Sequence, residues 1–222
     1  MPADLPDDRT TPARIRDAAI GRFASDGVPA TTVRGVALDA GVSPASVIHH
    51  FGSMDELRRA CDRHVAAIIR ERKSKAMAAG TGLDPLAALR EADEDPPVLR
   101  YLARTLADGS AEVAALLDEM ITDATAYMEE GVASGILVPT DHPRERAAVL
   151  TLWSLGALVL HDHVHRALGA NLVGSAAELA TTGAGYFRGA TDILTNGVLS
   201  EAMADRLAET LVPHDDLDRR DQ

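Results

Sequence analysis

Residues 31–51 constrain the fold of this chain most, because they combine two short helix patterns with a glycine between them. The first pattern has apolar residues at the i, i+3, i+4, i+7 spacing of one helix face: Val33, Val36, Ala37 and Ala40. Thr32 stands where a side-chain oxygen caps the first backbone N–H groups, and Gly41 has the backbone freedom that a tight turn needs.

The second pattern opens with Ser43 as N-cap and Pro44 at the first helical position, where a missing N–H costs nothing. Its apolar residues, Val47 and Phe51, are expected to be buried. The residues left facing outward are short: Ser43, Pro44, Ala45, Ser46 and His49. Such a face is slim enough to enter a DNA major groove about 12 Å wide, which favours a helix-turn-helix. Periodicity alone also allows an ordinary helical hairpin inside an all-α core.

From Ile15 to about Leu57 the chain resembles the DNA-binding domain of the TetR family of transcriptional regulators. The resemblance rests on several segments together, namely Ile15, Ala18, Ala19 and Phe23 with Asp26-Gly27, then Thr31–Arg34, Ala40–Ser43, His49–Phe51 and Ser53–Leu57. It covers roughly the first quarter of the chain, and the remainder is compatible with the family's variable helical domain.

The resemblance implies which residues approach DNA. Base contacts are implied for Arg34 and for the exposed part of the second helix, Ser43, Ala45, Ser46 and His49, with Pro44 in the same outward row. Phosphate contacts are implied for Thr32, His50 and Ser53, where free N–H groups and the helix dipole favour an anion.

Two residues depart from the family pattern. Ile48 stands where the family usually has a tyrosine that touches the DNA backbone, and Met54 where it usually has a phosphate-binding lysine. We therefore expect fewer ionic contacts and a shallower dependence of DNA affinity on salt, since each lost phosphate contact removes about one unit of slope.

The charge distribution agrees with a DNA-binding N-terminal region, although the chain as a whole carries a net charge of −12. Residues 9–75 hold 12 basic and 7 acidic side chains, whereas residues 76–222 hold 10 basic and 24 acidic ones. The N-terminal part can therefore meet phosphate while the rest is repelled by the duplex.

The rest of the chain contains helix signals and no convincing strand pattern, which predicts an all-α fold. Ser53 and Glu56 form a capping box for a long helix ending near Ala79, and Asp84-Pro85 and Asp95-Pro96 open two shorter helices. Further helices are expected over about 110–135, 141–169, 175–196 and 200–212.

Two of these helices favour an oligomer interface. Residues 147–160 are apolar on every side, and such a helix must be covered on every side. The next helix has one stripe of small and apolar residues, Ala176, Ala180, Gly183, Phe187, Ala190 and Leu194, with Gly185 and Gly189 nearby, which suggests close approach of backbones. The family forms a homodimer through its last two long helices, although an intramolecular core is the alternative.

The family resemblance also implies a cavity for a small-molecule effector in the larger domain. With 3% aromatic residues, a cavity lined by Leu, Met and Ala is favoured over one that stacks large flat ligands. The candidate lining residues carry a polar or polarisable atom among apolar neighbours: Tyr101, Met120, Tyr127, Met128, Trp153 and His161. Each of them could instead be plain core.

Other chemistry receives little support from the sequence. His161 and His165 lie one helical turn apart, but no third metal ligand accompanies them, so no metal site or cofactor is expected. Motifs of hydrolases, P-loop proteins and metalloproteases are missing, so no catalytic residue is assigned. The single cysteine, Cys61, excludes an intramolecular disulfide and fits a cytoplasmic protein, and the longest apolar run, Ala147 to Leu160, is too short to span a membrane.

The sequence thus predicts a homodimeric, ligand-responsive regulator that binds a palindromic operator in double-stranded DNA, most simply a repressor. Its expected parts are an N-terminal arm (1–10), a helix-turn-helix domain (11–57), a helical effector and dimerisation domain (58–212) and an acidic tail (213–222). The alternatives are an activator of the same fold, or a helical ligand carrier or enzyme that retains the helix-turn-helix domain as a remnant.

Overall fold

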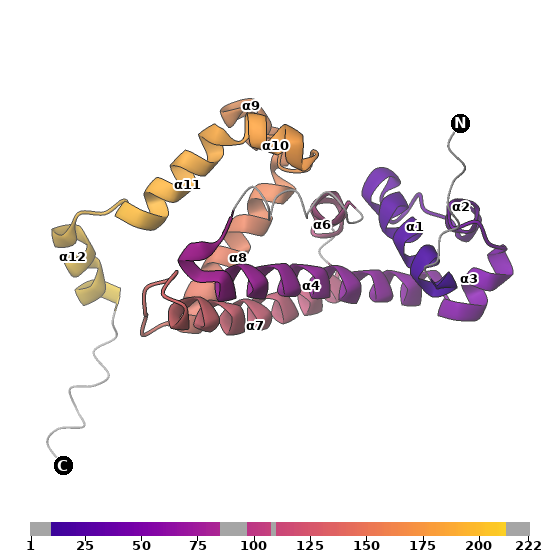
Figure 1. The fold of residues 1–222 in the computed structure, drawn as a ribbon, viewed down its shortest axis with the longest axis horizontal. Helices are drawn as coiled ribbons and strands as arrows, with labels where there is room; N and C mark the ends of the chain where they lie inside the picture. The colour runs from indigo at the N-terminus through magenta and orange to yellow at the C-terminus, as the bar shows by residue number, and fades with distance from the viewer. Residues whose placement is uncertain (1–9, 85–96, 108–109, 212–222) are drawn as a thin grey trace, which may run out of the picture.

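The computed structural model describes residues 10–84, 97–107 and 110–211, and these are helical with no strand among them. The N-terminal head consists of α1 (Thr11–Asp26), α2 (Val33–Asp39) and α3 (Pro44–Phe51) (Figure 1). Of these, α1 and α3 pack on α4 (Met54–Ala79), and α2 packs on α1 and α3. This order confirms the predicted all-α fold with an N-terminal helix-turn-helix.

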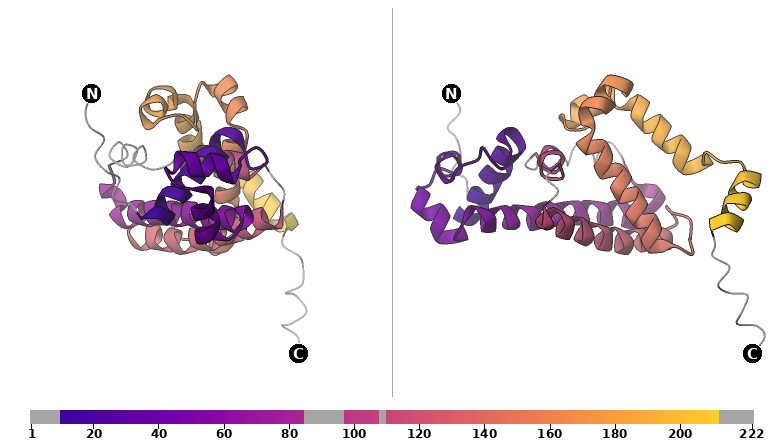
Figure 2. Two further views of the ribbon diagram at one scale, coloured as in Figure 1. Left: turned by 90° about the vertical axis from the view of Figure 1, so that its right-hand side faces the viewer. Right: turned by 180° about the vertical axis from the view of Figure 1, so that it is seen from behind.

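The long helix α4 joins the head to the rest of the molecule. Its 26 residues correspond to about 39 Å, and a 3-10 turn, Gly80–Gly82, follows it. Beside it lies α7 (Ala111–Ala133), while α6 (Val98–Thr105) packs on α1 and α8 (Pro143–Val159) packs on both α6 and α7 (Figures 1 and 2). The helix expected from Asp95-Pro96 corresponds to α6, whereas the one expected from Asp84-Pro85 falls outside the described residues.

The expected single helix over 141–169 is wrong, because the chain bends by 81° between α8 and α9 (His161–Leu168). The sequence becomes polar at His161 and Asp162, so the bend keeps α9 at the surface, where none of its residues is buried. No single helix in the described ranges is long and apolar enough to cross a bilayer, and only the bent pair α8 and α9 reaches that length and apolarity together.

The expected continuous helix over 175–196 is also wrong, since it divides at Gly183 into α10 (Ala176–Thr182) and α11 (Ala184–Asn196). A Cβ atom at Gly183 would lie 2.6 Å from the carbonyl oxygen of Leu179, so the break depends on glycine. Close backbone approach is found at Gly185, where a Cβ would lie 3.0 Å from the carbonyl oxygen of Leu168, while Gly189 has nothing within 4 Å.

The last helices extend away from the rest of the described chain (Figure 2). None of the residues of α11 is buried, and α12 (Glu201–Leu211) is exposed as far as its side chains are described. Residues 147–160 are covered only in part within one chain, because Val149, Leu152, Val159 and Leu160 are exposed. Their expected cover by a second copy stays a prediction.

Candidate DNA-binding surface and effector cavity

Three capped helix starts lie close together in the sequence of the head. The hydroxyls of Thr32, Ser43 and Ser53 accept hydrogen bonds from the backbone N–H groups of Gly35, Ser46 and Glu56, each at 3.1 Å. Each cap satisfies one N–H group of its helix, which leaves the other first-turn N–H groups available to an acceptor. All three capping residues are exposed, so these starts can meet an anion from solvent.

The outer face of α3 is open and its inner face is buried. Pro44, Ala45, His49 and His50 are exposed and Ser46 is half-buried, whereas Val47 is buried in the core. Gly41 adopts a φ of +64° in the turn before α3, a conformation that favours glycine. The sequence-based division of α3 into an outward row and an inward pair is thus found, although Phe51 is only half-buried.

An ion pair fixes α2 against α1. The guanidinium group of Arg22 donates to both carboxylate oxygens of Asp39, with distances of 2.6 and 2.9 Å. This bidentate geometry holds the C-terminal end of α2, the helix that carries the exposed Arg34.

The two departures from the family pattern have different surroundings. Ile48 is exposed beside His49, so an apolar side chain stands on the open face of α3. Met54 is half-buried and packs against the core of the head. Neither residue offers a charge or a hydrogen-bond donor to phosphate.

An apolar cavity of about 370 Å³ lies beyond the head, with walls from α4, α6, α7, α8, α10 and α11. Its lining includes Met120, Tyr127 and Met128, three of the six candidates selected from the sequence. Burial raises the pKa of the Tyr127 hydroxyl, so this group stays neutral and can act as a hydrogen-bond donor.

Sequence reasoning missed the contribution of α4 to this cavity. Ile69, Lys73 and Met77 of α4 line it, at the i, i+4, i+8 spacing of one helix face. The signal in the sequence is a lysine, Lys73, between the apolar residues Ile69 and Met77 of this helix face, which is where a cavity-lining charge can be recognised. Lys73 remains solvent-accessible, and desolvation among the surrounding walls lowers the pKa of its ammonium group.

The other three candidates do not line the apolar cavity. Trp153 is half-buried on α8, and His161 lines a separate polar cleft between α1, α6 and α9. Tyr101 is fully buried, with its ring 6.1 Å from that of Phe23 in α1, and its hydroxyl donates to Asp62 Oδ1 of α4 at 2.6 Å. Tyr101 therefore connects α6 to both α1 and α4.

The histidines of α9 form no metal site with other described residues. No group of three or more His, Cys, Asp or Glu side chains that could hold a metal ion occurs in the described part of the chain. His161 lies instead 3.3 Å from the carboxylate of Asp162, and His165 is exposed.

Two family models match this chain. Residues 15–61 match the family described as bacterial regulatory proteins, tetR family, and residues 93–200 match the tetracyclin repressor-like C-terminal domain. The HTH-type transcriptional regulatory protein RaaS of Mycobacterium tuberculosis is 39% identical over 158 residues, which cover 71% of this chain and 74% of RaaS.

Solved structures of similar fold align with this chain over nearly the whole of their own length. A TetR-family protein from Rhodococcus sp. superimposes with a TM-score of 0.56 at 19% identity and covers 83% of this chain and 97% of its own. The TetR family transcriptional regulator PfmR from Thermus thermophilus gives a TM-score of 0.51 at 22% identity, with 86% and 99% covered. At these identities the likeness establishes the fold alone.

Proposed function

Because the chain belongs to the TetR family of bacterial transcriptional regulators, we propose that it binds a palindromic operator as a homodimer and leaves DNA when a small molecule binds. The observation that carries the proposal is the open face of α3, which lies among three exposed, capped helix starts. Base contacts then come from Arg34, Ser43, Pro44, Ala45, Ser46 and His49, and phosphate contacts from Thr32, His50 and Ser53. The proposal includes no catalytic step.

The proposed domains are the arm (1–10), the head (11–57), the effector and dimerisation domain (58–212) and the tail (213–222). The density of apolar groups on the last helices supports the dimer. Phe187, Ile193 and Leu194 of α11 are exposed, as are Val198, Leu199, Met203 and Leu207 further along the chain. So many exposed apolar side chains on two successive helices and the segment between them favour burial against a second copy. Two heads held about 34–36 Å apart by the dimer can reach successive major grooves on one side of the duplex.

The apolar cavity is the proposed effector site. Its lining by Met120, Tyr127 and Met128 supports an effector with a mainly apolar body, and Arg72 and Lys73 add two basic side chains. Since α4 contributes to this lining and also packs under α1 and α3, a ligand that displaces α4 changes the spacing of the two heads. A DNA-bound protein of this kind works in the cytoplasm.

Selection of bound duplexes from a randomised pool tests operator binding. We expect the purified protein, at about 0.1 M salt, to recover a palindrome with half-sites near one helical turn apart. Arg34→Ala and His49→Ala should each weaken binding by about 1–3 kcal/mol and relax the preference at particular bases. Arg144→Ala, an exposed arginine on α8 outside the head, is the matched control and should leave the selected sequence unchanged.

Recovery of no common sequence by folded, dimeric protein would contradict the proposal and favour the carrier or enzyme alternative. Analytical ultracentrifugation tests the dimer separately. Leu194 of α11 is 59% exposed, and the variant Leu194→Arg should be monomeric. The control is Val138→Arg, at a residue that is 77% exposed and lies outside α11, and this variant should remain dimeric.

A further inference from the structure

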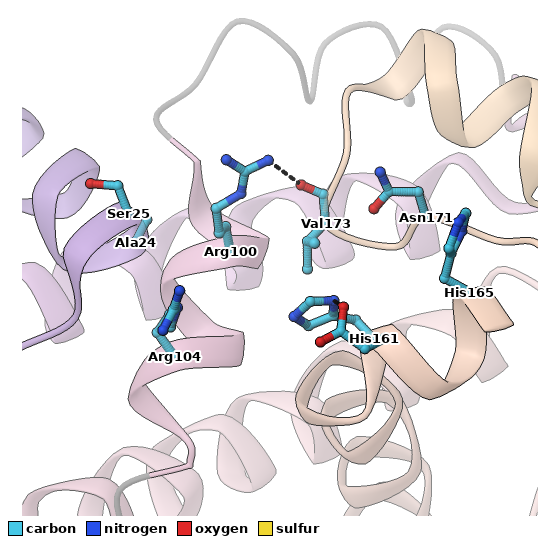
Figure 3. Close-up of a pocket in the computed structure, with 9 residues that line it drawn as sticks. Ala24, Ser25, Arg100, Arg104, His161, His165, Asn171 and Val173 are labelled. Carbon is cyan, nitrogen blue, oxygen red and sulfur yellow. Dashed lines mark hydrogen bonds and ion pairs between the residues drawn. The ribbon is translucent and has the colours of Figure 1, made fainter.

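The polar cleft differs from the apolar cavity in position and in chemistry. It has a volume of about 440 Å³ and is bounded by the end of α1, by α6, by α9 and by the segment that follows α9 (Figure 3). Its charged and titratable lining residues are Arg100, Arg104, His161, Asp162 and His165. In the described ranges 10–84, 97–107 and 110–211, imidazole is the one kind of ring that lines it, so these residues offer no platform for a large flat ligand.

Positive groups dominate this cleft even though the chain carries a net charge of −12. Arg100 and Arg104 lie one turn apart on α6, and two like charges at that spacing destabilise a helix. Among the residues that the structure describes, Asp162 is the one carboxylate in the lining, and its side chain is 93% exposed. Within the described lining, the two arginines therefore outnumber the acid.

The donors that face the opening retain capacity for a ligand. Arg100 donates one N–H to the carbonyl oxygen of Val173 at 3.3 Å, which leaves four of the five guanidinium donors (Figure 3). Arg104 is exposed and makes no ion pair or hydrogen bond within the described part of the chain. Figure 3 shows Arg100, Arg104 and the imidazole of His161 around the same opening.

We propose that this cleft binds a compact multivalent oxyanion, a phosphate ester or a polycarboxylate, with Arg100 and Arg104 as its charged ligands and His161 as a further donor. Guanidinium groups suit this class because their paired N–H donors match carboxylate and phosphate oxygens. The volume exceeds that of one phosphate and leaves room for a small polar body, since a water molecule occupies about 30 Å³ of liquid.

The position of the cleft gives the bound anion a structural consequence. Ala24 and Ser25 belong to α1 of the head, whereas Arg100, Arg104 and His161 belong to helices beyond it. Binding would neutralise the arginines and hold α6 and α9 together beside the end of α1. The anion would thus act at the joint between the head and the rest of the chain.

Isothermal titration calorimetry of the full-length protein tests the site without DNA, so its outcome is independent of operator binding. The probes are inorganic phosphate and citrate, titrated separately at constant ionic strength in a buffer free of both. We expect saturable binding of at least one probe at millimolar or lower concentration. Arg100→Gln and Arg104→Gln should each weaken it by about tenfold or more, as loss of a charge-assisted hydrogen bond does.

Arg166→Gln is the matched control, because it removes the same charge from an exposed position on α9 outside the cleft lining. Its affinity should stay within about twofold of the parent. No saturable heat from either probe up to about 10 mM would overturn the proposal, as would an equal loss of affinity in Arg166→Gln. Circular dichroism spectra that match the parent confirm that each variant is folded.

Discussion

The buried hydrogen bond between Tyr101 and Asp62 should stabilise the joint between α4 and α6 measurably. Tyr101 is fully buried and Asp62 is 8% exposed, and the hydroxyl lies 2.6 Å from the carboxylate oxygen. A hydrogen bond to a charged group contributes about 1.5–3 kcal/mol. Tyr101→Phe keeps the ring beside Phe23 and removes the hydroxyl that donates to Asp62, so the free energy of unfolding should fall by at least about that amount. The melting temperature should fall by about 3–12 °C.

The effect should depend on pH in a known direction. Burial raises the pKa of Asp62, while the hydrogen bond from Tyr101 and the charges of Arg58 and Arg63 lower it and Glu112 raises it. A carboxyl group with a raised folded pKa binds its proton more tightly in the folded state, so its contribution to stability grows as pH falls through that pKa. Without the Tyr101 donor the pKa of Asp62 rises further. The difference between Tyr101→Phe and the parent should therefore shrink in acid, where Asp62 is protonated in both.

Urea unfolding followed by circular dichroism, at about pH 8 and in steps down to the lowest pH at which the protein stays folded, at one protein concentration, measures both effects. Asp62→Asn is the control, because its amide oxygen still accepts from Tyr101 while the buried charge is gone. It should lie within about 1 kcal/mol of the parent at the higher pH. A Tyr101→Phe variant within about 0.5 kcal/mol of the parent at the higher pH, or a difference that does not change with pH, would refute the reasoning.

Three further predictions concern single residues. Met54→Lys should steepen the salt dependence of operator binding by about 0.9 units for each phosphate gained, which binding isotherms over a salt series measure; an unchanged slope would count against a phosphate near this position. Cys61 is buried and burial raises the pKa of its thiol, so it should react slowly with a disulfide reagent in the folded protein and rapidly in urea, and fast reaction in both would contradict that burial. Gly183→Ala should lower stability by about 1–3 kcal/mol in thermal unfolding, whereas Gly21→Ala in α1, with nothing within 4 Å, should raise it; equal effects would argue against a forced break.

Local signals in the sequence are sufficient to predict where the helices of the head begin. Thr32, Ser43 and Ser53 are predicted as N-caps from their positions before apolar periodic segments, and each accepts the hydrogen bond that this role requires. Caps and turns depend on residues within one helical turn, so a single sequence contains the necessary information.

The bend at Leu160 depends on tertiary packing, which periodicity does not report, whereas the break at Gly183 involves local contacts with Leu179 and Phe187. Leu160 lies in an apolar run that continues the helix pattern, yet the chain bends there so that the polar residues of α9 reach the surface. The same limit explains why sequence reasoning finds Met120 and Tyr127 for the apolar cavity but misses Ile69 and Lys73. The first pair stands out as polarisable or polar atoms among apolar neighbours, whereas the second pair depends on which face of α4 meets α7 and α8.

The arrangement along α4 restricts how a change in the apolar cavity can reach the head. At its C-terminal end, the Ser134 hydroxyl donates to the Met77 carbonyl oxygen at 2.6 Å and holds α4 to the end of α7. At its middle, Asp62 is held by Tyr101, and eleven residues separate it from Lys73 in the cavity, about 16 Å of helix. Between these two contacts α4 packs along α7, where Arg70 and Asp123 form an ion pair at 3.3 Å. A ligand that tilts α4 in the cavity would therefore also change the contact between Asp62 and Tyr101. Because Phe23 of α1 packs against the ring of Tyr101, we expect such a tilt to reach α1 by this route as well as through the direct packing of α4 on α1.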